Sequence, residues 1–212
     1  MMETNFKYIA SSRSTEELIE RVENRQKYMP ETTETSVAEL QHRKHEFTDE
    51  ELKVIGEDVQ AQRENAVVVI GNLTMFNDDY KNVIVEDPDA PLMYSRRVIY
   101  FFSVFGGALI GSILVAMNIA KMGKRNEALY TVLFGVVFTV ILYVVGLRIG
   151  AVSSTLYRIA FGLIAAYCLD YFFWKRFIGY STFYRARSFW APLIIVFIIA
   201  ALAIIVTKYG VQ

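Results

Sequence analysis

Residues 98–120 read VIYFFSVFGGALIGSILVAMNIA, 23 consecutive positions without a charged side chain. An α-helix needs about 20 apolar residues to cross the ~30 Å hydrocarbon core of a bilayer. Helices of soluble proteins usually carry a polar face along such a length, because only one side packs on the core. We therefore predict that this stretch spans a membrane.

Three further apolar runs follow, and each is long enough to cross a bilayer. The third run contains Arg158 and Asp170. Both lie near the ends of the expected helix, where a long basic side chain can extend to the headgroups. The fold class predicted is thus an all-α membrane protein with a bundle of about four spans: residues 98–120, 128–147, 152–174 and 189–207. A third segment that is interfacial or re-entrant is the alternative.

The first 95 residues have a very different composition. They hold 10 basic and 20 acidic residues, a balance of −10, whereas the remainder holds 12 basic and 2 acidic residues, a balance of +10. Such asymmetry predicts two parts with different surroundings. The basic part suits the anionic surface of a membrane. The acidic part predicts a water-soluble domain that does not bind nucleic acid.

Helix starts are recognisable in this acidic part. Ser14 and Glu17 have the spacing of a capping box, and so do Thr48 and Glu51. Pro30 suits the first turn of a further helix, where its missing N–H costs nothing. Such short helices are marginal alone in water. Because their apolar faces are small, residues 1–65 are predicted to be a thin helical domain that needs a partner or self-association.

Residues 66–95 connect this domain to the membrane part. The β-branched stretches 66–70 and 83–85 flank a polar turn and predict a short β-hairpin. The alternative is that the third helix continues through Met75. The segment 86–91, EDPDAP, predicts an extended linker, because each proline disfavours helix at the preceding residue.

Two stretches resemble a known group of proteins: ENRQKYMPE at residues 23–31, and VEDPDAP at 85–91 running into a first span that ends AMN at 116–118. They are similar to uncharacterised bacterial multi-span membrane proteins with acidic helical N-terminal domains. The resemblance implies a bacterial inner membrane and supplies no activity and no site residues.

Several residues of the membrane part are candidates for a role. Gly107 and Gly111 form a Gly-x-x-x-Gly pattern, which favours close packing of helices in lipid. Ionisable and polar residues within spans are functional candidates, as a transport path or as interfacial anchors. They are Asn118, Arg158 and Asp170. Basic residues interleaved with aromatics after the third span predict headgroup binding. They are Lys175, Arg176, Arg185 and Arg187.

The sequence contains few residues or motifs that could support catalysis. His42 and His45 are the only histidines, and Arg43 and Lys44 beside them favour a solvated helix end over a metal site. Dinucleotide and phosphate-binding glycine motifs do not occur. We expect no cofactor, no metal and no enzymatic activity.

Two features of the sequence favour opposite directions of insertion into the membrane. With four spans, the loops after the first and third hold seven basic residues and the other side holds five, so the positive-inside rule leans toward an external N-terminus. A charged domain of about 95 residues that begins without a signal-peptide pattern favours a cytoplasmic N-terminus instead. We adopt the cytoplasmic N-terminus.

These observations predict a non-enzymatic membrane scaffold or accessory subunit. Its partners would be the lipid bilayer and either further copies of the chain or another membrane protein. The alternative is a small oligomeric channel or transporter, with the polar residues of the spans along its path.

Overall fold

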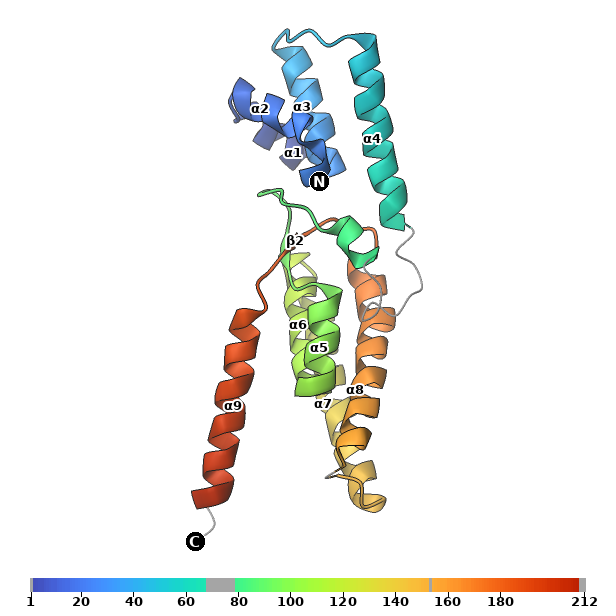
Figure 1. The fold of residues 1–212 in the computed structure, drawn as a ribbon, viewed down its shortest axis with the longest axis vertical. Helices are drawn as coiled ribbons and strands as arrows, with labels where there is room; N and C mark the ends of the chain where they lie inside the picture. Colours follow the sequence, from blue (N-terminus) through green and yellow to red (C-terminus); the bar gives the residue numbers. More distant parts are fainter. Residues whose placement is uncertain (1, 68–78, 153, 210–212) are drawn as a thin grey trace. The chain divides into compact units, whose positions relative to one another are not determined.

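The computed structural model describes residues 2–67, 79–152 and 154–209, and this part of the chain is mostly helical (Figure 1). The chain divides into two compact units. The N-terminal unit comprises Met1–Leu92 together with Gly179–Arg185, and the C-terminal unit comprises Met93–Ile178 and Ala186–Gln212.

The N-terminal unit is built from short helices. They are α1 (Met2–Ser11), α2 (Thr15–Glu23), the 3₁₀ turn η1 (Arg25–Lys27), α3 (Pro30–His42), α4 (Asp49–Val67) and the 3₁₀ turn η2 (Asp79–Val83). The three predicted helix starts are confirmed. Ser14 caps α2 in a complete capping box with Glu17, and Pro30 occupies the first turn of α3. Thr48 and Glu51 bond reciprocally at the start of α4. Helix α1 was not predicted.

Helices α1, α2 and α3 share one small apolar cluster. Its buried members are Ala10, Leu18, Val22 and Leu40, one or two from each of these helices. Four partly buried apolar residues pack around them: Ile19, Val37, Phe47 and Ile55. This cluster therefore leaves several of its apolar side chains partly open to solvent.

The segment predicted as an extended linker is bonded into this unit. The Asp87 carboxylate is fully buried and accepts hydrogen bonds from the Met29 backbone N–H at 3.1 Å and the Thr32 hydroxyl at 2.6 Å. Met29 precedes α3 and has no side-chain cap of its own. Asp87 therefore caps α3 from far along the sequence. Nearby, Asp89 pairs with the buried Arg21 at 2.9 Å.

The predicted β-hairpin falls largely outside the described residues, which exclude 68–78. Its first residues, 66 and 67, belong to α4. On the other side, Ile84 forms a parallel bridge with Tyr184. The described chain also has one two-stranded sheet, formed by β1 (Leu92–Met93) and β2 (Arg185–Ala186).

The C-terminal unit contains the apolar helices. They are α5 (Arg96–Gly106), α6 (Ala108–Lys121), α7 (Arg125–Arg148), α8 (Thr155–Cys168), the π-helix η3 (Leu169–Ile178) and α9 (Trp190–Tyr209). Helix η3 follows α8 without a break, so Thr155–Ile178 forms one helix of 24 residues.

The first predicted span, 98–120, is wrong. The helix breaks at Gly107, whose φ of 89° and ψ of 167° turn the chain back on itself. The two ends of the resulting pair meet: the Tyr94 N–H donates to Asn118 Oδ1 at 2.9 Å, and Asn118 Nδ2 donates to the Tyr94 carbonyl at 2.8 Å. Thus α5 and α6 form a helical hairpin and lie side by side (Figure 1).

Only two helices of the described chain are long and apolar enough to cross a membrane, instead of about four. They are α7 and the continuous Thr155–Ile178 helix, each with 24 residues. The re-entrant alternative considered for the third segment therefore does not fit that segment, because it forms one of the two long helices. The fourth predicted span corresponds to α9, whose second half lies mostly outside the described side chains.

Glycines allow the helices of this unit to approach closely. A Cβ at Gly162 of α8 would lie 2.7 Å from the Val104 Cα of α5. At Gly135 of α7 it would lie 2.6 Å from the Ser112 Cβ of α6. The hairpin is thus held between α7 and α8 by contacts that a larger residue would prevent.

Candidate functional site

The most deeply buried charges of the C-terminal unit are Arg96 and Asp170. Arg96 Nε donates to Asp170 Oδ1 at 2.8 Å, and Nη2 donates to Oδ2 at 2.6 Å. The side chains are 3% and 8% exposed. This is the bidentate geometry in which a guanidinium and a carboxylate bind most strongly. The Tyr100 hydroxyl also donates to Asp170 Oδ2, at 3.3 Å.

Local sequence explains how these groups meet. Ser95 caps α5, since its hydroxyl accepts from the Val98 N–H. This cap places Arg96 in the first turn and Tyr100 one turn later on the same face. Asp170 comes from η3, and π-helical segments are often found at functional positions. The result is a charge pair that joins the start of the hairpin to the second long helix.

The three polar residues expected along a path lie in different surroundings. Asn118 is 1% exposed and bonds to the backbone of Tyr94. Asp170 binds Arg96. Arg158 is exposed in the first turn of α8. The structure therefore brings Asp170 together with Arg96, which was not among the candidate residues, and not with Arg158 or Asn118.

The Gly-x-x-x-Gly residues have two different roles. Gly107 forms the turn of the hairpin, and a Cβ there would have no neighbour within 4 Å. Gly111 is a packing position, because a Cβ there would come within 2.9 Å of the Ser103 Cβ on α5. The partner of Gly111 is thus the other arm of the same hairpin.

The four residues predicted to bind headgroups lie next to aromatic rings or in β2. Lys175 and Arg176 are exposed in η3. The Lys175 ammonium lies 4.8 Å from the centre of the Tyr171 ring. Arg187 lies 4.9 Å from the centre of the Tyr94 ring. Arg185 is half-buried in β2. Aromatic and basic groups combined in this way suit the interface between lipid and water.

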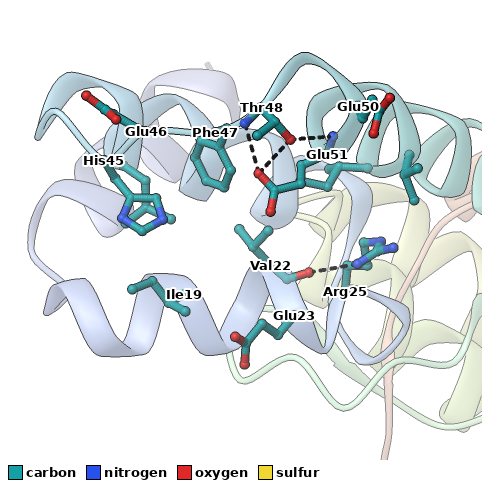
Figure 2. A pocket seen from close by; sticks show the side chains of 13 residues that line it. Ile19, Val22, Glu23, Arg25, His45, Glu46, Phe47, Thr48, Glu50 and Glu51 are labelled. Carbon is teal, nitrogen blue, oxygen red and sulfur yellow. Dashed lines mark hydrogen bonds between the residues drawn. The ribbon is translucent and has the colours of Figure 1, made fainter.

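An open groove of about 580 Å³ lies in the N-terminal unit, between α2 and the start of α4 (Figure 2). Figure 2 shows Ile19 and Val22 of α2 facing Phe47, which precedes α4. Leu40 and Ile55 complete its apolar surface, which we call the floor. Val54, 50% exposed, lies at its edge.

Four glutamates line the same groove: Glu23, Glu46, Glu50 and Glu51. The Thr48 N–H, 2.8 Å from Glu51 Oε2, lowers the pKa of that carboxyl, and the Thr48 hydroxyl acts in the same direction. The other three glutamates form no ion pair with any described residue. We call these four carboxylates the acidic rim.

The cationic and imidazole groups of the groove are already engaged. The Arg25 guanidinium binds Asp58, with Nε at 2.7 Å from the carboxylate. The His45 ring contacts the Phe47 ring edge to face, with centroids 4.9 Å apart. The groove therefore combines an apolar floor with net negative charge.

No family model, curated protein or solved structure matches this chain.

Proposed function

We propose that this chain is a non-enzymatic scaffold or accessory subunit of a complex in the inner membrane of a bacterium. In this proposal α7 and the Thr155–Ile178 helix cross the bilayer. Helix α7 would be about 36 Å long, enough for a ~30 Å hydrocarbon core. The Thr155–Ile178 helix has the same number of residues but ends in the π-helix η3, so it is somewhat shorter. Only 17% and 28% of their most apolar stretches are buried in the protein. Apolar helices left so uncovered favour contact with lipid over a soluble core.

The hairpin would then be re-entrant. Its arms have 11 and 14 residues, so the first arm is about 16 Å long and the hairpin reaches about half-way across the core. Non-helical backbone at this depth is tolerated where protein covers it. At the turn, Gly106 and Gly107 are partly buried and Ala108 is buried.

The main observation in favour of the accessory role is that the buried polar residues are bonded within the fold. Asn118 and Asp170 hold bonds that fix the ends of the hairpin. A transport path needs polar groups that can exchange partners with a passing solute, and these two are committed to the fold. By contrast, the acidic rim of the N-terminal unit remains open. This contrast favours docking over the channel or transporter alternative.

The hairpin also affects the distribution of basic residues between the two sides of the membrane. If α5 and α6 return to the side from which they start, chain connectivity places nine basic residues on the side of the N-terminal unit: Arg96, Arg97, Lys121, Lys124, Arg125, Lys175, Arg176, Arg185 and Arg187. The loop between the two long helices has only Arg148 and Arg158 nearby. The positive-inside rule now favours a cytoplasmic N-terminal unit. The count of basic residues made from the sequence favoured an external N-terminus because it treated 98–120 as a span that crosses the membrane.

Cysteine labelling tests this topology. With Cys168 replaced by serine, single cysteines at Tyr8, Asn126 and Ile149 are treated with a membrane-impermeant maleimide on right-side-out vesicles. We expect Ile149→Cys to react, and Tyr8→Cys and Asn126→Cys to react only after permeabilisation. Labelling of positions 8 and 126 from opposite sides would mean that 98–120 crosses the membrane after all.

The accessory role predicts a partner. Affinity purification of the full chain from its native membranes in mild detergent, followed by native mass spectrometry, should yield a stoichiometric complex with a different membrane protein. A pure homo-oligomer that conducts a solute in liposomes would contradict the accessory role and support the transporter.

A further inference from the structure

We propose that the groove between α2 and α4 binds a basic amphipathic segment of a partner protein. This inference rests on the accessory role and names the chemistry of the partner and the surface that receives it.

The floor presents apolar surface that the unit itself does not cover. Ile19, Phe47 and Ile55 pack against the buried core but stay partly open. Val54 extends this apolar surface at the edge. A partly open apolar groove of about 580 Å³ is the kind of surface that receives the apolar face of a helix.

The rim determines the charge of the occupant. Glu23, Glu46 and Glu50 are exposed and have no cationic partner among the described residues, while Arg25 is neutralised by Asp58. Complementary charge around an interface steers association and selects partners. A segment with lysines or arginines beside its apolar face would match both parts of the groove.

Other occupants fit less well. The rim would repel an anionic lipid surface. The N-terminal 95 residues carry a balance of −10, so a second N-terminal unit would be repelled as well. Among the residues that the structure describes, no group of three or more His, Cys, Asp or Glu side chains could hold a metal ion. The glutamates are therefore too dispersed for a cation site and suit an extended basic partner.

A peptide pair tests the inference directly. The probe is a fluorescent 18-residue amphipathic peptide of leucine and lysine, with the same peptide carrying glutamate in place of lysine as its counterpart. Binding is measured by anisotropy to the full chain in nanodiscs of zwitterionic lipid, with empty nanodiscs subtracted. We expect the lysine peptide to bind at least tenfold more tightly than the glutamate peptide, and less tightly as salt is raised.

Matched variants locate the binding. Replacement of Glu23, Glu46 and Glu50 by glutamine should weaken binding about tenfold, because the peptide would lose three exposed ion pairs and each contributes modestly. The control replaces three exposed glutamates outside the groove, Glu57, Glu64 and Glu86, and changes the net charge equally. Val54→Asp, at an exposed edge position, should also weaken binding.

If the two triple variants weaken binding equally, the effect comes from the total charge of the unit and not from the groove, and the proposal is wrong. Equal binding of the lysine and glutamate peptides would also contradict it. Purification of the native complex distinguishes a failure of this proposal from a failure of the accessory role. If the native partner stays bound to the groove variants, the groove proposal fails and the accessory role stands. If the wild-type chain has no stoichiometric partner, the accessory role itself fails.

Discussion

Replacement of Asp170 by alanine is expected to destabilise the C-terminal unit by about 3–5 kcal/mol. Arg96 has a side chain only 3% exposed and would lose both of its bonds to the carboxylate. Removing one partner of a buried ion pair is costly because the remaining charge stays away from water. The unfolding free energy of the full chain in detergent micelles, measured by denaturant titration, gives the effect.

Two further variants make this result specific. Arg158→Gln removes an exposed charge from the same long helix, and we expect its effect to stay within about 0.5 kcal/mol. The double replacement of Arg96 by methionine and Asp170 by leucine removes both charges, so it should recover most of the lost stability. An Asp170→Ala chain as stable as the Arg158→Gln chain would show that the pair contributes nothing to the fold.

Gly107→Ala is expected to destabilise the hairpin by about 1–3 kcal/mol and to shift it toward a continuous helix. The φ of 89° and ψ of 167° at this position belong to a region that is essentially restricted to glycine. An uninterrupted helix over 96–121 would be about 39 Å long and could cross the bilayer. A cysteine at Asn126 should then become partly accessible from the opposite side.

Gly106→Ala is the matched control, because Gly106 ends α5 without a positive φ. A Cβ there would meet the end of the flexible Ile110 side chain at 3.1 Å, so we expect a smaller loss of stability and unchanged labelling at position 126. Identical labelling patterns in the two variants would show that the backbone conformation of Gly107 does not determine the hairpin.

Local signals in the sequence predicted local structure well. The capping boxes at Ser14 and Thr48 and the proline at the start of α3 act within one helical turn, so neighbouring residues contain all the information needed. The apolar runs likewise identified α7 and the Thr155–Ile178 helix, since length and composition are sufficient for that purpose.

The features that were missed depend on residues far apart in the sequence. Asp87 caps α3 across 58 positions, and Arg96 pairs with Asp170 across 74.

The break at Gly107 was missed for another reason. An apolar run with two adjacent glycines has the same hydropathy whether it crosses the membrane or turns back, and the distinction depends on partners such as Tyr94 and Asn118.

The half-depth hairpin has a geometric consequence for the surrounding lipid. In the proposed orientation, the cytoplasmic leaflet would contain sections of α5, α6, α7 and the Thr155–Ile178 helix, whereas among these elements only the two long helices continue into the outer leaflet. A helix with its side chains is about 10–12 Å wide, so the two hairpin arms add roughly 200 Å² of cross-section on one side only. This part of the protein would be wedge-shaped, and its elastic energy would be lowest where the bilayer curves so that the cytoplasmic leaflet is expanded.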